Sequence, residues 1–449
     1  MLNVIKNLIK MVNIKNKIRS VKYGGAVVGS EEIQAIIRSI RNSRKTCNWQ
    51  SAEEGAKFEQ EAAKFLGVGY GVLANSGSSA GLLALSALEL PRGSEVIICA
   101  VTFPTIFNII LQCNLTPVVV DAKVGTYGFS IEDVEKAIIK KTKAIIAIHP
   151  LGNPVDMPAL MKLVRKYEEQ GQKIWVIEDG CDSWGSEIGG RKVGSFGDVS
   201  ITSFHAAHII SMGVGGGVFT DSRQIASNVR MYRDWGRQAD INKSENKKWK
   251  QLPKDYNPRF IYEKIGYNFQ VLELQAAMGR VQLRKILQIK AARKRNFDYL
   301  VRHLSKYNSG GHGGYALNMP KTVHNADVCW FAFPLTYWGD RGGLLRHLEK
   351  NGIETRPLFS GNICLHPAYK DANFRISGKL DGANFIAKHS FWISCHPSLT
   401  KSDLRYMVEV FDDFFNPDDH KKHIEIHKLD DFERQGLKMV RAHENYGKD

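Results

Sequence analysis

The chain has 449 residues, more than one hydrophobic core usually supports, so we expect two domains or one large domain with a smaller appendage. Hydrophobic residues make up 43% and charged residues 24%, as in globular proteins, and no apolar run reaches the roughly 18 residues of a membrane span. The formal charge of +16 is spread along the chain on expected helix faces. This favours a solvated surface over a nucleic-acid site and also suits a small anionic substrate.

The chain begins with a lysine-rich, amphipathic stretch, residues 1–25, that lacks the apolar core and cleavage site of a secretory signal. We interpret it as a basic N-terminal arm. The seven cysteines are scattered without metal-ligand spacing, and several fall in apolar runs typical of buried strands. Because such thiols stay reduced in the cytoplasm, the sequence predicts a cytoplasmic protein.

Residues 70 to 220 alternate short β-rich runs with helical stretches, which predicts an α/β fold. The β-rich runs are almost continuously apolar, as in a mostly parallel sheet with helices on both faces. They are EVIICAVTF, TPVVVDA, AIIAIHP, IWVIEDG and VSITSF. Ligands of such sheets bind at the carboxyl ends of the strands, where Thr102, Phe103, Asp179 and Ser203 fall.

The second half of the chain is less regular. Residues 234–262 are polar and without periodicity, so we expect a long loop. The segment ELQAAMGRVQLRKILQIKAARKRNFDYLVRHL predicts one long helix that leads into a second domain, with a glycine-rich loop at 309–314. The charged tail carries three histidines on one helical side, which solvated side chains explain better than a metal site (His420, His423 and His427).

Two motifs carry more specific chemistry. LANSGSSAGLLAL, residues 73–85, sets small residues directly before an amphipathic helix. Its free backbone N–H groups and serine hydroxyls could cradle a phosphate, although a serine-capped helix explains the same pattern. Asp179, at the end of an apolar strand, is either a loop carboxylate or a partner for a cationic ring nitrogen. Neither motif decides the function by itself.

The stretch SITSFHAAHIISMGVGGGVFT, residues 200–220, runs from a strand into a glycine-rich turn and carries His205 and His208. Histidines at a strand end are often structural groups with satisfied hydrogen bonds, but an ordinary pKa of about 6.5 also equips them for proton transfer. A His-x-x-His metal site is the third interpretation, for which the sequence offers no recognisable third ligand.

These segments occur in an order that resembles the DegT/DnrJ/EryC1/StrS sugar aminotransferase family, pyridoxal-phosphate enzymes of the aspartate aminotransferase fold. The resemblance rests on NSGSSAGLLAL, TFPTIFN, VIEDGCDSWGS, GSFGDVSITSFHAAH, GVGGGVFT, IGYNFQVLELQAAMGRVQL, WFAFPLT and GIETRPLFSGN. It implies a large fold type I domain with a mostly parallel seven-stranded sheet, and a smaller C-terminal α+β domain. The expected divisions are the arm at 1–25, the cofactor-binding domain at 26–297, the small domain at 298–416 and a charged tail at 417–449.

The resemblance also implies where the cofactor phosphate would bind. Gly77 and Ser78 of NSGSS would hold it, and Ser203 would add its hydroxyl. Asn268 of the partner subunit would reach the same phosphate, so the family pattern implies a homodimer with shared active sites.

The cofactor ring has its own expected partners. Phe103 would stack on the pyridine ring, and Asp179 would keep the ring nitrogen protonated so that the ring accepts electrons. Asp182 would lie near the ring hydroxyl. His205 and Arg356 are further candidates for the site.

At the position of the family's Schiff-base lysine, five residues after Ser203, this chain carries His208. Because an imidazole cannot form a stable internal aldimine, the resemblance narrows to the nucleotide-sugar 3-dehydratases, which use the amine form of the cofactor, pyridoxamine phosphate. The implied reaction is loss of the C3 hydroxyl from a nucleotide-linked 4-keto-6-deoxyhexose, with His208 as acid and base. The implied nucleotide is GDP or CDP, and L-glutamate would regenerate the amine cofactor.

An iron–sulfur cluster is not expected, because the segment after DWGR (234–237) lacks the cysteines with which the CDP-linked members hold theirs. The chain also departs from the dehydratases by having His205 and Ala206 for Tyr-Pro, and Val214 for Glu. These departures leave open another pyridoxal- or pyridoxamine-phosphate reaction, such as transamination or isomerisation, or a non-catalytic member that senses cofactor or sugar nucleotide. A nucleic-acid-binding protein is the least favoured alternative. The implied products are deoxysugars of surface polysaccharides such as the lipopolysaccharide O-antigen.

Overall fold

The computed structural model describes residues 19–237, 252–253, 256–257, 260–308 and 316–416. Its largest feature is an eight-stranded sheet with the order β1-β9-β8-β5-β4-β2-β3-β13. Strand β9 runs antiparallel to both neighbours, and the pairs from β8 to β13 are all parallel, which confirms the expected mostly parallel sheet. The strands are β1 (Tyr70–Ala74), β2 (Glu95–Cys99), β3 (Thr116–Val120), β4 (Thr142–Ile148), β5 (Trp175–Asp179), β8 (Val199–Ser203), β9 (Gly216–Thr220) and β13 (Arg375–Ile376).

Strand β13 is the difference from the expected seven strands. It comes from the C-terminal part of the chain and pairs in parallel with β3 at the edge of the sheet. The guanidinium of Arg375 holds it there by donating to the Glu95 carboxylate at 2.7 Å and to the Ala137 carbonyl at 2.8 Å. With two residues, β13 is too short to carry an alternation pattern, so the sequence could not reveal it.

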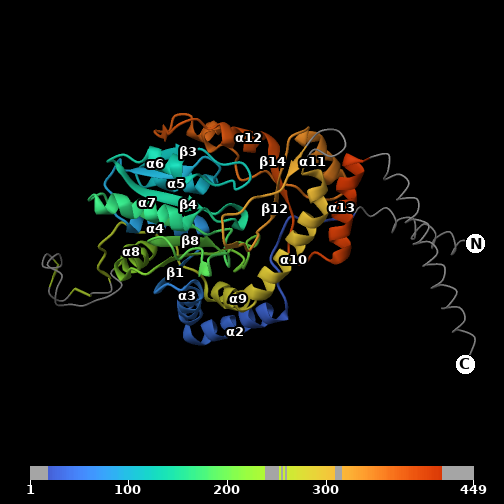
Figure 1. Cartoon of the computed structure of the whole chain (residues 1–449). Coiled ribbons are helices and arrows are strands. Elements are labelled where there is room, and N and C mark those ends of the chain that lie inside the picture. The colour runs from blue at the N-terminus through green and yellow to red at the C-terminus, as the bar shows by residue number, and fades with distance from the viewer. Residues whose placement is uncertain (1–18, 238–251, 254–255, 258–259, 309–315, 417–449) are drawn as a thin grey trace, which may run out of the picture.

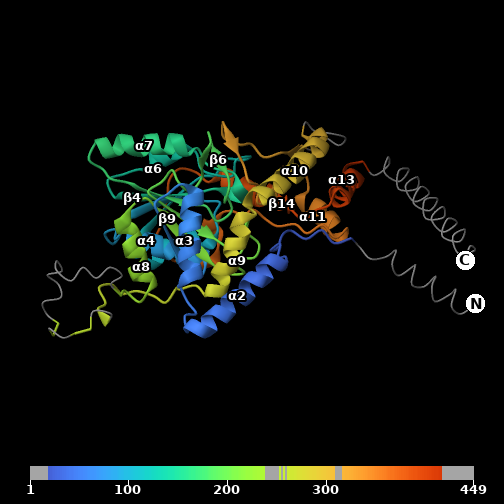
Figure 2. The same ribbon diagram turned by 90° about the horizontal axis from the view of Figure 1, so that it is seen from below.

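Helices surround the sheet, and β2 and β8 are buried along their whole length. Helices α2, α3 and α9 gather on one side, where α3 packs on β1 and α9, and α2 packs on α9 (Figures 1 and 2). Helix α4 packs on β8, β9, α5 and α8. Their bounds are α2 (Ser30–Thr46), α3 (Glu53–Leu66), α4 (Gly77–Ala87), α5 (Pro104–Gln112), α6 (Ile131–Ala137), α7 (Met157–Glu169), α8 (Arg223–Arg233) and α9 (Glu273–Arg284).

A second, smaller sheet has the order β10-β12-β14, and its paired strands are antiparallel. Its strands and helices share a second apolar cluster that includes Leu300, Phe333, Phe391 and Phe411. The elements are β10 (Leu317–Asn318), β12 (Phe333–Tyr337), β14 (Ser390–Ile393), α10 (Ile286–Leu304), α11 (Arg341–Lys350) and α13 (Lys401–Phe415). Helix α12 (Asp381–His389) contributes Ile386 to the core of the large sheet instead. The domain boundary at residue 297 stays a prediction, because the segments that follow it contribute side chains to both apolar clusters, that of the large sheet and that of the smaller one.

The long helix predicted from the sequence is two helices. Helix α9 ends at Arg284 and α10 begins at Ile286, with Lys285 between them at φ −92° and ψ −1°. The Lys285 amine lies 2.7 Å from a carboxylate oxygen of both Glu31 and Glu32, so the break is fixed by ion pairs to α2. The amphipathic pattern continues across it, which is why the sequence indicated one helix.

The segment before α2 crosses the molecule. Val21 belongs to the smaller apolar cluster and exchanges hydrogen bonds with Gly352 and Glu354, at 2.8 and 3.0 Å. The Gly25 carbonyl lies 2.8 Å from Nε2 of His396. Gly24 lies beside the Ala207 carbonyl of the turn that carries the two histidines. Residues 21–25, here called the N-terminal strap, thus join the smaller sheet to that turn.

Several sequence-predicted segments lie outside the described residues: most of the arm, the 309–314 loop and the charged tail with its histidines. Within the described ranges, no helix has the length and apolar character needed to cross a lipid bilayer.

One buried carboxylate joins α9 to α3. Glu273 is 3% exposed and accepts hydrogen bonds from three backbone N–H groups at the start of α3, those of Ala52, Glu54 and Gly55, at 2.7 to 3.0 Å. The first N–H groups of a helix have no partner within the helix, and a carboxylate there also meets the positive end of the helix dipole.

We predict that Glu273→Gln lowers the free energy of unfolding by about 2 to 4 kcal/mol, since the amide loses the charge and turns an NH₂ group toward donors. Chemical denaturation measures the change. The control is Glu169→Gln at the exposed end of α7, which should leave stability unchanged. Equal effects of the two variants would contradict the capping role.

Candidate functional site

A cavity of about 380 Å³ lies at the carboxyl ends of β4, β5 and β8 and at the N-termini of α4 and α5. This is where ligands bind in sheets of this kind. It collects most of the residues singled out from the sequence. They are Gly77, Ser78, Phe103, Asp179, Asp182, Ser203, His205, His208 and Val214. Its lining also includes Cys181, His149 and Phe359, which no specific signal in the sequence marked.

The turn before α4 fits an anion. Ser76 caps the helix by accepting the Ser79 N–H at 3.0 Å, which confirms the capping interpretation. A Cβ at Gly77 would lie 2.6 Å from Cβ of Ser203, and only glycine allows β8 to approach so closely. The N-terminus of an 11-residue helix therefore opens into the cavity beside the Ser203 hydroxyl, a suitable cradle for phosphate.

Asp179 ends β5 and is 7% exposed. Its carboxylate accepts the Cys181 N–H at 3.1 Å, and no cationic side chain in the described part of the chain forms an ion pair with it. Burial raises the pKa of Asp179 above its usual value. A buried carboxylate that faces a cavity without a cation is well suited to a cationic ring nitrogen.

His208 and Asp182 face each other across the floor of the site, with 3.5 Å between Nε2 and Oδ1. Burial and the neighbouring His205 lower the pKa of His208 to about 4. Burial, and then the charge of Asp179, raise the pKa of Asp182 to about 7. Near neutral pH the imidazole is therefore uncharged and has a lone pair available for a proton. Its Nδ1 is buried without a hydrogen-bond partner.

His205 lies differently from His208. It is exposed, its ring centre is 5.9 Å from that of His208, and its Nδ1 accepts the Ala207 N–H at 3.3 Å. Val214 lines the cavity nearby and is 49% exposed. Among the described residues, no group of three or more potential ligands could hold a metal ion.

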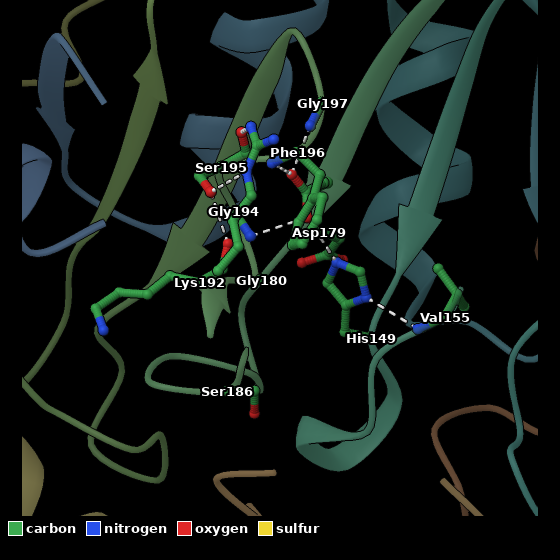
Figure 3. A network of polar contacts seen from close by, with 12 residues as sticks. His149, Val155, Asp179, Gly180, Ser186, Lys192, Gly194, Ser195, Phe196 and Gly197 are labelled. Atoms are coloured by element: carbon green, nitrogen blue, oxygen red, sulfur yellow. Dashed lines mark hydrogen bonds and ion pairs between the residues drawn. The ribbon is translucent and has the colours of Figure 1, made fainter. Parts of the chain in front are cut away.

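A buried carboxylate that the sequence reasoning missed fixes this edge of the sheet. Glu178 is 0% exposed and accepts the N–H groups of Gly194, Phe196 and Gly197 at 2.6 to 2.8 Å (Figure 3). His149 accepts the Val155 N–H on Nδ1, so its Nε2 carries the proton and donates to Glu178 at 3.3 Å. A glutamate inside an otherwise apolar strand was the signal available in the sequence.

Two candidates lie outside the cavity lining. Asn268 pairs with Asp234 in an isolated antiparallel bridge, and its contribution to the partner subunit's site stays a prediction. The Arg356 guanidinium lies 4.2 Å from the centre of the Tyr23 ring and donates to the Thr355 carbonyl. Arg356 therefore belongs to the surroundings of the N-terminal strap.

Phe359 lines the cavity with a strained backbone. Its φ of 45° is in the left-handed region, which is rare for a bulky side chain. The loop is held in place because Ser360 donates to the Thr102 carbonyl at 2.7 Å and the Ile363 N–H donates to the Ala100 carbonyl at 3.0 Å. Strain that the surroundings maintain at a cavity is common in functional sites.

The sheet order, with a cavity at the carboxyl ends of the strands and beside the N-terminus of α4, is that of the aspartate aminotransferase fold of pyridoxal-phosphate enzymes. Residues 29–412 match the DegT/DnrJ/EryC1/StrS aminotransferase family, and the chain belongs to it. The cofactor of this class is pyridoxal phosphate or its amine form, and the protein is a sugar-modifying enzyme by its family.

Individual relatives are more varied. The chain is 34% identical to the lipopolysaccharide biosynthesis protein RfbH of Salmonella typhimurium, over 87% of this chain and 91% of that protein. It is also 34% identical to the dTDP-4-dehydro-2,6-dideoxy-D-glucose 3-dehydratase of Saccharopolyspora spinosa, over 88% and 86%. The Escherichia coli GDP-4-keto-6-deoxy-D-mannose-3-dehydratase with bound hydrated PLP superposes with a TM-score of 0.76 at 25% identity, covering 87% of this chain and all of that one.

The raised pKa of Asp182 makes a prediction about stability. Its carboxyl titrates at about 7 when folded and at 3.8 when it is fully solvated, so the folded chain binds the extra proton between these values. The stabilisation from this group is complete below pH 3.8 and is lost as the pH rises through 7. In the cofactor-free protein, the free energy of unfolding of Asp182→Asn minus that of the native chain should therefore be about 2 kcal/mol higher at pH 8 than at pH 5.5.

Urea denaturation of the cofactor-free protein at both pH values measures this difference. Asp156→Asn, at an exposed helix cap, is the matched control and should give the same change at both pH values. If Asp182→Asn also changed the free energy of unfolding equally at both pH values, Asp182 would have to be ionised in the folded protein already at pH 5.5.

Proposed function

We propose that this protein catalyses the pyridoxamine-phosphate-dependent C3 dehydration of a nucleotide-linked 4-keto-6-deoxyhexose, with His208 as the acid and base. The observation that carries the proposal is an uncharged imidazole in the cavity, at the position where the family resemblance expects the lysine. No lysine is among the described residues that line the cavity. A covalent anchor for the cofactor is therefore missing from the lining, whereas a proton-transfer group is present.

The proposed roles follow from the chemistry of each side chain. When bound, the cofactor supplies an amine that condenses with a ketone and a ring that accepts an electron pair. Gly77, Ser78 and Ser203 would hold the phosphate, and Phe103, which is 57% exposed, would lie against the ring. Asp179 would keep the ring nitrogen protonated.

His208 would then accept and return a proton through Nε2, beside Asp182. Since burial keeps its pKa low, the imidazole starts uncharged and can act as a base first. The proton it takes up would serve the departing C3 hydroxyl, which leaves as water. Asp182, with its pKa of about 7, can share that proton across the 3.5 Å contact.

The nucleotide is part of the proposal as well. The resemblance implied GDP or CDP, and relatives named as GDP- and dTDP-linked 3-dehydratases support trying three nucleotides. Relatives named GDP-perosamine synthase favour the second candidate, an aminotransferase-like reaction on a nucleotide sugar. L-Glutamate as the amino donor and a cytoplasmic location complete the proposal.

The proposal also includes a homodimer. Ile33, Ile37 and Ile40 lie on α2 at 52, 43 and 41% exposure, at a spacing that puts them on one helical face. An exposed apolar stripe of this kind usually meets another protein surface. In a dimer, the segment that carries Asn268 would complete the site of the second subunit.

The direct test is turnover. The protein is incubated with pyridoxamine phosphate, L-glutamate and the GDP-, CDP- or dTDP-linked 4-keto-6-deoxyhexose, and loss of the C3 hydroxyl is followed by NMR. We expect His208→Asn to lower the rate about 100-fold or more, the usual contribution of a general acid and base. His324→Asn, at an exposed histidine, should keep full activity. Turnover that survives His208→Asn would rule out the assigned base, and binding without turnover would favour a sensing role.

A second test concerns the missing lysine. The protein loaded with pyridoxal phosphate is reduced with borohydride and its peptides are analysed by mass spectrometry. We expect no pyridoxyl-lysine, because a non-covalent aldehyde leaves no amine link to reduce. A His208→Lys variant is the positive control, and a pyridoxyl group on a lysine of the native chain would contradict the proposal.

A further inference from the structure

Arg293 of α10 is a buried cation that is not in an ion pair within the described residues, although its charge lowers the pKa of Asp182. It is 2% exposed, and its Nη1 donates to the main-chain carbonyls of Phe331 at 2.6 Å and Trp330 at 3.3 Å. Its Nε has no hydrogen-bond partner, and in the described part of the chain it forms no ion pair. Burying a charge without an ion pair is costly, and here two main-chain carbonyls, the Cys395 thiol and the Phe331 ring surround the guanidinium.

The main chain that Arg293 holds leads to both members of the His208–Asp182 pair. The Phe331 N–H donates to the Leu151 carbonyl at 2.9 Å, and the Leu151 N–H donates to Asp182 at 3.3 Å. The Phe331 ring meets the His208 ring edge to face, with 5.7 Å between centroids. Fixing residues 330–331 therefore fixes the acid through its backbone donor and the imidazole through an aromatic contact.

Close packing makes this connection rigid. Gly152, next to Leu151, has φ of 93°, and a Cβ there would lie 2.3 Å from the Cys329 carbonyl. Ser186 accepts the Cys329 N–H at 2.9 Å and donates to the Gly152 carbonyl at 2.8 Å. The 329–331 segment and the 151–152 turn thus move together.

The Arg293 charge lies behind the Phe331 ring, 5.9 Å from its centre. It disfavours a second positive charge nearby. Burial and the charge of His205 are the larger causes that lower the pKa of His208 to about 4, and Arg293 adds to them; for His396, whose pKa is also about 4, Arg293 is the next cause after burial. The other titratable groups that interact with His208 are His205 and Asp182, and those that interact with Arg293 are Asp182, Cys329, Cys395 and His396.

We propose that Arg293 is a positioning residue: it locks residues 330–331 so that Asp182 and the His208 ring face each other, and it sets a fixed positive charge behind the imidazole. Its importance for turnover rests on the proposed function, whereas its effect on His208 does not. Arg293 touches neither the cavity nor the reacting groups directly, and it acts through Phe331 and Leu151.

The experiment titrates the histidines of the cofactor-free protein by NMR, with ring-labelled histidine and His208→Asn for assignment. Arg293→Gln keeps a donor for the carbonyls and removes the charge, so we expect the His208 pKa to rise above its native value. Arg293→Lys keeps the charge and should leave that pKa close to native. If Arg293 had only a structural role, both variants would have a lower melting temperature but the same His208 pKa. Equal His208 pKa values in Arg293→Gln and Arg293→Lys would therefore overturn the proposal.

If Arg293→Gln does not fold, Arg293→Met, which also removes the charge and suits a buried position, replaces it in the same titration. The His208 pKa should again lie above that of Arg293→Lys, and equal values would overturn the proposal. In the NMR turnover assay, the acid limb of kcat should move to higher pH in Arg293→Gln with little change in KM. An absence of turnover in the native enzyme would contradict the proposed function alone, since the titration decides on Arg293 independently.

Discussion

The site depends on one buried carboxylate that never reaches the cavity. Glu178 ties three chain segments to one point: β5, the 194–197 turn that leads into β8, and His149 before the 150–152 turn. The next residue along β5 is Asp179, and the 150–152 turn supplies the backbone donor for Asp182. Hydrogen bonds to a buried charge are strong and are costly to leave unmade. These hydrogen bonds therefore fix the carboxyl edge of the sheet, and with it the positions of the side chains that face the cavity.

The charged and titratable groups around the cavity are distributed unevenly. Asp179 and Asp182 are buried acids whose pKa values are raised, His208 is an imidazole whose pKa is lowered, and the buried cation Arg293 lies behind the Phe331 ring. A poorly solvated carboxylate is stabilised by a cationic ring nitrogen, and a neutral imidazole can accept a proton. Perturbed pKa values that cluster in a cavity are typical of functional sites. The pattern suits proton transfer beside a cofactor that is bound by hydrogen bonds and charge.

The sequence predicted the sheet well, because strands buried on both faces are continuously apolar and few other structures produce that pattern. It also predicted the residues at strand ends and at the start of α4, since their position in the chain implies their position in space. Arg293 could not be found in this way. It stands among other cations in KAARKRN, and only tertiary packing separates the buried arginine from its exposed neighbours. The break at Lys285 was missed for a similar reason, since the ion pairs that fix it come from a distant helix.

The N-terminal strap has a consequence for how the chain folds. Val21 and Gly25 bind to Gly352, Glu354 and His396, which are more than 300 positions away in the chain. Contacts of such long sequence separation form late and slowly, because a large loop must close first. During synthesis the strap cannot complete its hydrogen bonds until the ribosome has passed residue 396, because Gly352 and Glu354 are reached first and His396 last, whereas the strands from 70 to 220 can already pair. The wall beside the histidine turn is therefore the last part of the site to form, and the nascent chain holds an unfinished pocket until the protein is nearly complete.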